Sequence, residues 1–257
     1  MSGTPAGITK LTLPGVWSPQ LRNRRDVDVY LPPSYADARD RYPVLYMQDG
    51  QNLCDPATAF AGTWYLLDVL ADLARGGLDL IVVGVHHRGR ERITEYGPYP
   101  DRRCGPGKGD RYLQFLTSTL KPRIDRRFRT KRGRDATAIL GSSMGGLISL
   151  YAFFKHAGVF GAAGAMSPAL WYGDRRIFDA IGGARPQGRI YLDMGTEEGA
   201  VALRDARVLA DRLEQAGYRP GQSLMWVEEV GGRHREQDWS RRLGRAIAFL
   251  FSEGVPA

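Results

Sequence analysis

Cysteine, long apolar runs and concentrated charge are all scarce in this sequence of 257 residues. Two cysteines, Cys54 and Cys104, are too few for a disulfide framework and have no metal-finger spacing, so we expect both to be unpaired. No run approaches the ~18 to 20 apolar residues of a membrane span, and the first residues lack the charged-then-apolar plan of a signal peptide. We therefore expect a cytoplasmic protein with no membrane partner.

The positive charge is spread along the chain. Lysine and arginine number 36 against 28 acidic residues, a formal net charge of +8. A nucleic-acid partner would require a concentrated basic stripe, so we expect none. The glycine-rich run 105–109 is not a phosphate loop, because no strand precedes it and no helix bearing Ser or Thr follows its lysine.

Short β-branched runs alternate with segments of helical period, which predicts an α/β fold with a mostly parallel sheet and helices on both faces. The expected strands are 27–31, 44–47, 80–85, 137–140, 162–166, 190–194 and 224–230. The expected helices are 63–74, 112–120, 144–155, 201–216 and 237–251. The first strand alternates in polarity, which predicts an antiparallel start to the sheet. We expect a single domain over 1–257, with 88–110 as a long surface loop near the active site.

A candidate nucleophile follows the strand 137–140. Gly141, Ser143 and Gly145 form the pattern G-x-S-x-G, and an apolar helix begins directly after it. In a nucleophile elbow, glycines flank the serine because the sharp strand-to-helix turn leaves no room for side chains. Strand, elbow and helix occur here in the required order. The sequence therefore predicts Ser143 as a nucleophile.

A serine hydroxyl needs a base to activate it, and the chain has four histidines. His234 lies in a loop after the last expected strand, where hydrolases with this elbow carry their base. His156 ends the helix after the elbow and is interpreted as structural. His86 and His87 close another strand; they could line the site, but adjacent histidines point in opposite directions and suit a shared metal poorly.

The acid that orients the base should lie between Ser143 and His234, just past a strand. Glu198 is our first choice, because Gly195 and Glu198 form a turn of the type that presents the acid in hydrolases of this order. Glu197, Asp193 and the absence of any functional acid remain alternatives.

An oxyanion hole requires two backbone N–H donors, worth about 3 to 4 kcal/mol each. The residue after the nucleophile, Met144, supplies one. The second should come from the loop after an early strand, where Gly50 permits a tight turn. We therefore predict the N–H of Gln51 as the second donor.

These segments together resemble the branch of the α/β hydrolases known as putative esterases, which includes esterase D, enterochelin esterase, and bacterial feruloyl and acetylxylan esterases. The likeness is carried by RDVDVYLPPSY (25–35), LYMQDGQNLCDP (45–56), ITEYGP (93–98), LGSSMGGLISLY (140–151), SPALWY (167–172) and GGRHREQDW (231–239). They span nearly the whole chain in family order. The resemblance implies an α/β-hydrolase fold with Ser143, His234 and Glu198 as the catalytic triad and with Gln51 and Met144 as oxyanion donors.

The sequence departs from the family pattern in three places. Cys54 stands where an aromatic residue is usual, His86 and His87 replace an Asp–Asn-like pair, and the acid is Glu198 where many relatives have aspartate. Some relatives work as a Ser–His dyad, and some are acyltransferases.

We therefore expect a serine carboxylesterase that acts on a small-molecule ester through an acyl-enzyme and requires no metal or organic cofactor. The alternatives are a siderophore trilactone esterase, a feruloyl or acetyl sugar esterase, an acyltransferase to a sugar alcohol, and a non-catalytic binding protein. The expected substrate-binding residues are Trp64, His86, Tyr96, Trp171, Tyr172 and Trp239. The oligomeric state cannot be predicted.

Overall fold

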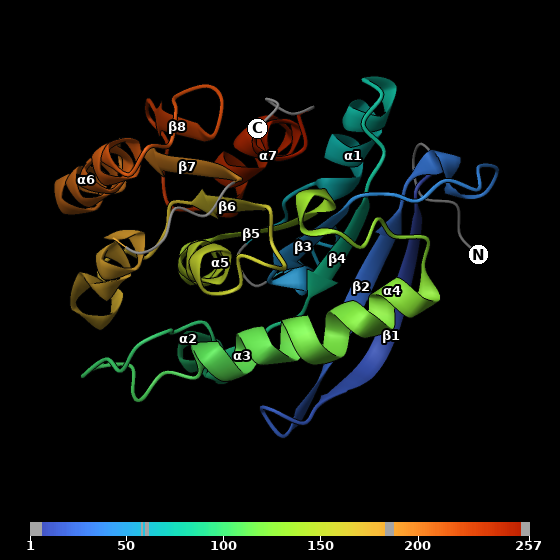
Figure 1. The fold of residues 1–257 in the computed structure, drawn as a ribbon, viewed down its shortest axis with the longest axis horizontal. Coiled ribbons are helices and arrows are strands. Elements are labelled where there is room, and N and C mark those ends of the chain that lie inside the picture. Colours follow the sequence, from blue (N-terminus) through green and yellow to red (C-terminus); the bar gives the residue numbers. More distant parts are fainter. Residues whose placement is uncertain (1–6, 58, 60–61, 183–187, 253–257) are drawn as a thin grey trace.

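The computed structural model describes residues 7–57, 59, 62–182 and 188–252. Within these residues, eight strands form one sheet in the order β1-β2-β4-β3-β5-β6-β7-β8 (Figure 1). The strands are β1 (Thr9–Ser18), β2 (Asn23–Leu31), β3 (Val44–Gln48), β4 (Ile81–Val85), β5 (Thr137–Ser142), β6 (Ala162–Met166), β7 (Arg189–Gly195) and β8 (Leu224–Glu229). Strand β2 is antiparallel to both β1 and β4, and the six strands β3 to β8 are mutually parallel. Strands β1 and β8 lie at the two edges.

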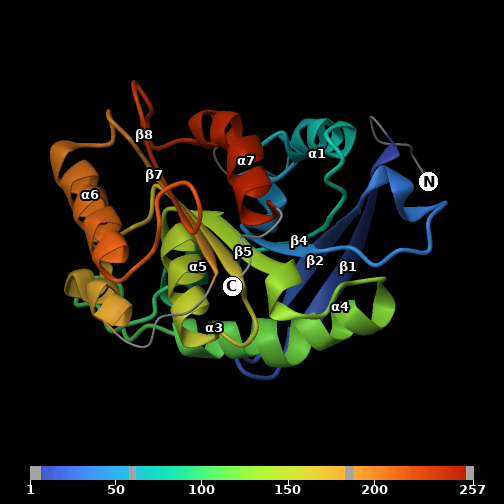
Figure 2. The same ribbon diagram turned by 45° about the horizontal axis from the view of Figure 1, so that its top comes forward.

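Helices cover both faces of the sheet, as Figure 2 shows. The α-helices are α1 (Leu66–Arg75), α2 (Arg92–Glu95), α3 (Gly109–Phe115), α4 (Lys121–Arg127), α5 (Met144–Lys155), α6 (Ala200–Gln215) and α7 (Glu236–Leu250). Helices α1 and α7 pack on one face, and α3 to α6 pack on the other. A π-helical turn, η5 (Leu116–Leu120), joins α3 to α4.

The two hydrophobic cores follow from the alternation of side chains along a strand. In β3, Val44 and Tyr46 belong to the core under α3 to α6, whereas Leu45 and Met47 belong to the core under α1 and α7. All four side chains are at most 1% exposed. A strand buried on both faces therefore has to be apolar at every position, which is why the central strands were visible as uninterrupted apolar runs.

The mostly parallel sheet and its antiparallel start are confirmed, but three predictions of elements were incomplete. Strand β1 was not predicted, because Pro14 and Gly15 interrupt it at a register shift between Leu13 and Val16. The helix expected at 112–120 extends from Gly109 to Arg127 through the π turn. The segment 88–110 is not wholly a loop, since it contains η4 (Gly89–Glu91) and α2. Among the helices of the described residues, none is long and apolar enough to cross a membrane.

A buried ion pair fastens the segment 88–110 to the antiparallel end of the sheet. The Nη2 atom of Arg25 in β2 lies 3.0 Å from Oε1 and 2.9 Å from Oε2 of Glu95, and both side chains are at most 1% exposed. Asn23 also donates to Oε1 of Glu95, at 2.7 Å. The guanidinium packs over the rings of Tyr112 and Phe115. Removal of one partner of such a pair strongly destabilises the fold, because the other charge remains buried without compensation.

Replacing Arg25 alone should therefore destabilise the protein. We expect Arg25→Met to lower the free energy of unfolding by about 3 to 5 kcal/mol, because it leaves the Glu95 carboxylate buried without its cation. The double variant Arg25→Met/Glu95→Leu should recover most of this loss, since no unpaired charge remains. Urea unfolding followed by circular dichroism measures both, and a double variant as unstable as the single one would contradict the explanation.

Candidate active site

The register of the parallel strands brings the predicted site segments together at the carboxyl ends of these strands. Met47 of β3 pairs with Leu140 of β5, and Ser142 of β5 pairs with Met166 of β6. Met166 in turn pairs with Asp193 of β7, and Gly195 pairs with Glu229 of β8. The loops that leave these strands carry Gln51, Ser143, Ser167, Glu198 and His234. In open α/β sheets, ligands bind in crevices at the carboxyl ends of the strands.

Ser143 occupies a strained turn between β5 and α5. Its backbone has φ 56° and ψ −121°, a combination that is unfavourable for any residue with a side chain. A Cβ on Gly141 would lie 2.7 Å from the carbonyl carbon of Gly145 and 2.7 Å from Cγ of Gln48. The glycines therefore permit a close approach of strand, helix and the end of β3. Ser143 is half-buried, as a nucleophile accessible from one side should be.

The predicted base and acid are in direct contact. Nδ1 of His234 lies 2.6 Å from Oε2 of Glu198. The Glu198 side chain is 2% exposed, and its other oxygen accepts hydrogen bonds from Oγ of Ser167 at 2.6 Å and from the amide of Gly195 at 2.8 Å. Burial alone would raise the pKa of Glu198, but the hydrogen bonds from His234, Ser167 and Gly195 hold this pKa below its usual value. Glu198 is therefore a carboxylate at neutral pH, which suits it to accept the Nδ1 proton of His234.

Backbone hydrogen bonds join the loop of the acid to the loop of the base. The amide of Glu197 donates to the carbonyl of Gly232 at 3.0 Å, and the amide of Thr196 donates to Glu229 at 3.0 Å. The amide of Gly231 donates to the hydroxyl of Thr196 at 2.9 Å. These three hydrogen bonds tie the two loops to each other.

The other two candidate acids have different partners. Glu197 is half-exposed and pairs with the exposed Arg233 at 2.5 Å. Asp193 is fully buried; its carboxylate accepts two hydrogen bonds from Arg242, at 2.9 and 3.1 Å, and one from the amide of Ser167 at 2.9 Å. Of the three acids, Glu198 is the one whose carboxylate contacts His234.

Ser167 and Arg242 support the acid and were not identified from the sequence. Oγ of Ser167 donates to Glu198 and accepts from Nε1 of Trp239 at 2.9 Å and from Nη2 of Arg242 at 3.2 Å. The Arg242 side chain is 1% exposed and its Nη2 lies 4.0 Å from Oε1 of Glu198. The position of Ser167 directly after β6 was an available signal, because loops at this edge carry the site. No local sequence pattern indicated that Arg242 would pair with Asp193.

The loop of the predicted second oxyanion donor is held from several sides. Asp49 has φ 56°, and its carboxylate accepts two hydrogen bonds from Arg92, both at 2.7 Å. The ring of His86 would lie 2.8 Å from a Cβ on Gly50, and its Nε2 lies 3.0 Å from Oδ2 of Asp28. The Gln51 side chain accepts from the amide of His87 at 3.1 Å. These contacts fix the path of the backbone through Gln51.

Met144 is the first residue of α5. The first amides of a helix have no acceptor within the helix, which is compatible with the predicted role of the Met144 N–H as an oxyanion donor. A Cβ on Gly145 would lie 3.0 Å from Cβ of Gln48, which brings the end of β3 against the start of α5.

Most of the aromatic residues predicted to bind substrate are buried. Trp64 and Trp239 stack on each other with centroids 5.8 Å apart, and Trp239 also contacts the ring of His234 edge-on at 4.9 Å. Tyr96 and Tyr172 are fully buried, whereas Trp171 is 43% exposed. Of these rings, Trp171 is the one exposed to solvent, and the other four are packed inside the protein. Two of the four also form hydrogen bonds: Trp239 donates to Ser167, and the Tyr96 hydroxyl accepts from the amide of Asp49 at 3.2 Å.

Neither a metal site nor a disulfide is found in the described residues. No group of three or more His, Cys, Asp or Glu side chains there could hold a metal ion. Cys54 and Cys104 are free thiols.

Comparisons with known proteins give consistent relatives. A family model described as Putative esterase matches residues 18–250. The uncharacterized protein YbbA of Bacillus subtilis is 26% identical over 245 residues, which cover 90% of this chain and 94% of that protein. An endo-1,4-beta-xylanase/feruloyl esterase of Xylanibacter ruminicola is 25% identical over 243 residues, 91% of this chain and 30% of that protein.

A solved structure shares the fold. The enterobactin esterase FES from Shigella flexneri superposes with a TM-score of 0.77 at 20% identity, over 97% of this chain and 61% of that one. At this identity the likeness shows the common architecture.

The hydrogen bonds to Glu198 should make stability depend on pH. Because the pKa of Glu198 is lower in the native state than in the unfolded chain, its contacts stabilise the fold fully above the unfolded pKa of about 4.3. This contribution is lost as the pH falls through the lowered native pKa. We expect the difference in unfolding free energy between wild type and Glu198→Gln to be constant near neutral pH and to shrink under acid conditions.

Urea unfolding over a pH series measures this difference. Glu197→Gln is the matched control, because its exposed ion pair with Arg233 contributes little to stability. A difference for Glu198→Gln that grows on acidification would contradict the assignment of the charged state.

Proposed function

The chain belongs to the esterase family described as Putative esterase and is a carboxylic ester hydrolase, and on that premise we propose that Ser143, His234 and Glu198 carry out the reaction through an acyl-enzyme. The observation that carries the proposal is the 2.6 Å contact between Nδ1 of His234 and the buried carboxylate of Glu198, at the same edge of the sheet as the strained Ser143. Such a contact fixes the tautomer in which Nε2 can accept a proton.

In the acylation half-reaction, Oγ of Ser143 attacks the ester carbonyl carbon while Nε2 of His234 takes the hydroxyl proton. The carbonyl oxygen becomes an oxyanion, which accepts hydrogen bonds from the N–H groups of Met144 and Gln51. The C–O bond to the alcohol then breaks, and the imidazolium of His234 returns the proton to the departing alkoxide. Ser143 is left as an acyl ester.

In the deacylation half-reaction, water takes the place of the alcohol. His234 removes a proton from the water as its oxygen attacks the acyl carbon, and the same two N–H groups stabilise the second oxyanion. Collapse of this intermediate breaks the bond to Oγ, which recovers its proton from His234. Glu198 stays charged throughout and stabilises the imidazolium in each half-reaction.

The related proteins suggest two substrate classes: one is named for feruloyl esters and another for enterobactin, a siderophore. A panel of p-nitrophenyl esters, feruloyl and acetylated sugars and a catecholate trilactone would rank these classes for this chain. Acyl transfer to a sugar alcohol is a second outcome, and comparison of products with and without the acceptor would detect it. Hydrolysis without an acceptor yields the free acid in both cases.

Removal of the Ser143 hydroxyl should abolish both turnover and covalent labelling. We expect Ser143→Ala to lower kcat for p-nitrophenyl acetate by a factor of about 10⁴ or more and to lose labelling by a fluorophosphonate probe. Ser142→Ala, which removes the neighbouring hydroxyl, should still be labelled. Undiminished labelling of Ser143→Ala would mean that another residue is the nucleophile. Absence of labelling in wild type would mean that the chain only binds its ligand.

The choice among the acids is tested by a matched pair of amides. We expect Glu198→Gln to lower kcat by about 10⁴, because an amide neither fixes the required tautomer nor stabilises the imidazolium. Glu197→Gln should stay close to wild type. A large loss in Glu197→Gln alone would transfer the role, and wild-type rates in both variants would indicate a Ser–His dyad.

A further inference from the structure

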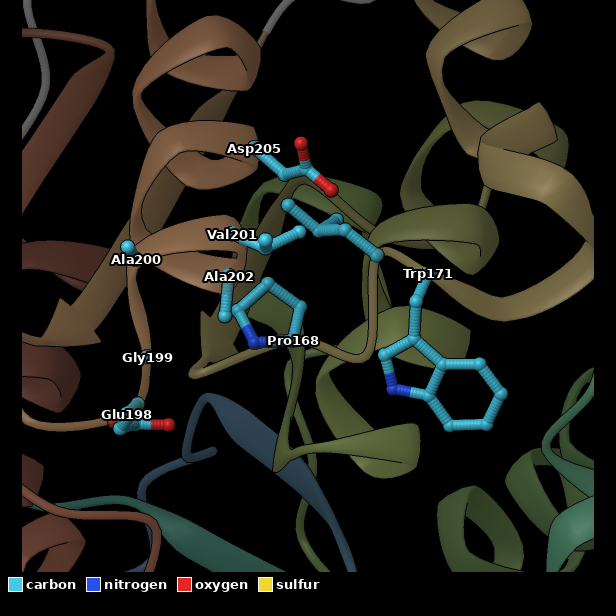
Figure 3. A pocket seen from close by; sticks show the side chains of 9 residues that line it. Pro168, Trp171, Glu198, Gly199, Ala200, Val201, Ala202 and Asp205 are labelled. Carbon is cyan, nitrogen blue, oxygen red and sulfur yellow. The ribbon is translucent and has the colours of Figure 1, made fainter.

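A cavity of about 360 Å³ opens beside the acid of the proposed triad. It lies between the segment after β6 and the beginning of α6, as Figure 3 shows. The segment after β6 contributes Pro168, Leu170 and Trp171, and the start of α6 contributes Val201 and Ala202. Its volume falls in the range of small-molecule sites, about 300 to 1,000 Å³. None of the catalytic steps above uses it.

Both walls of the cavity are tied to the catalytic residues. On one side, Pro168 follows Ser167, whose hydroxyl donates to Glu198, and the amide of Ala169 donates to the carbonyl of Ser143 at 3.0 Å. On the other side, Glu198 itself lines the cavity and the chain continues through Gly199 into α6. Both walls of the cavity are therefore hydrogen-bonded to, or continuous in the chain with, residues of the proposed triad.

The cavity presents apolar side chains that the fold leaves in water. Trp171 is 43% exposed and Val201 is 54% exposed, although both are large apolar residues. The two side chains come from facing walls in Figure 3. The guanidinium of Arg103 lies 5.2 Å from the centroid of the Trp171 ring and supports this ring. Exposed apolar side chains gathered around a hollow are typical of a ligand site.

The charged groups that line the cavity already have partners. Asp205 pairs with Arg175 at 2.6 Å and with Arg204 at 3.3 Å. The Glu198 carboxylate is engaged by His234, Ser167 and Gly195. A charged ligand would find no unpaired counter-ion among these lining residues, and its desolvation would cost free energy. The lining therefore favours an uncharged apolar occupant, and its Pro, Leu, Val and Ala side chains favour a flexible aliphatic one.

We propose that this cavity binds an aliphatic chain of the ester, so that the enzyme prefers esters with a medium-length alkyl chain to the corresponding short-chain esters. This inference rests on the proposed function, because it takes the ester to be bound at Ser143. This alkyl chain belongs either to the acid or to the alcohol of the ester. The chemistry of recognition is the same, since each methylene taken out of water favours the complex.

Two substrate series and a filled cavity test the proposal. p-Nitrophenyl acetate and octanoate vary the acid, and methyl and octyl acetate vary the alcohol. We expect wild type to show a higher kcat/KM for the longer chain in one of the two series, and that series identifies the source of the chain. Val201→Trp, which places a large ring in the cavity, should lower kcat/KM for the longer substrate of that series about tenfold or more, while kcat/KM for the shorter substrate changes less than about twofold.

The matched control is Val208→Trp. Val208 is also exposed, at 39%, and lies two turns along the same side of α6 but does not line the cavity. This variant should keep the wild-type ratio of long-chain to short-chain substrate. Trp171→Ala supplies a second variant at the cavity, and we expect it to reduce the same ratio. Circular dichroism and thermal melts check that each variant is folded.

The outcomes separate this inference from the proposed function. If wild type hydrolyses acetates in a Ser143-dependent manner but shows no chain-length preference in either series, the cavity proposal is wrong and the triad is unaffected. An unchanged ratio in both Val201→Trp and Trp171→Ala would also overturn it. If Ser143→Ala hydrolyses acetates as fast as wild type, the proposed function itself fails.

Discussion

The candidate site is organised around one buried carboxylate. Glu198 is almost inaccessible to water, so each of its oxygens must find donors within the protein. His234 satisfies one oxygen, and Ser167 with the amide of Gly195 satisfies the other. Ser167 is in turn held by Trp239 and Arg242 of α7. The requirement to solvate one charge therefore connects β6, β7, the loop after β8 and helix α7.

The residues that stabilise the fold and the residues of the candidate site occupy different parts of the sheet. Its two faces are apolar and supply the cores, whereas the polar groups gather where the parallel strands end. In β3, alternate residues enter opposite cores, and the chain becomes polar only at Gln48 and Asp49, where it leaves the sheet. Because Gln48 also lies against the elbow glycines, the central strands position the candidate nucleophile Ser143 and the loop of the predicted oxyanion donor Gln51 together.

Local patterns predicted much of this arrangement, and non-local contacts account for the rest. The parallel strands were visible as apolar runs, and the elbow, the Gly195–Glu198 turn and the His234 loop were visible as short patterns at strand ends. The bond between Glu198 and His234 joins residues 36 positions apart, and it was inferred from chain order, the Gly195–Glu198 turn and the family resemblance. The pairing of Arg242 with Asp193 could not be inferred, since burial of an arginine depends on a partner 49 residues away. Likewise, nothing local distinguishes the buried Trp64 from the exposed Trp171.

The location of β8 at the edge of the sheet has a consequence for heat inactivation. Ser143 follows a central strand that has neighbours on both sides, but His234 follows an outermost strand paired on one side only. Residues 225–229 of that strand are all partly accessible to solvent. Local opening takes place preferentially where few contacts must break, so fraying at this edge would withdraw the imidazole while the elbow stays folded. Loss of turnover on warming would then precede cooperative melting of the sheet.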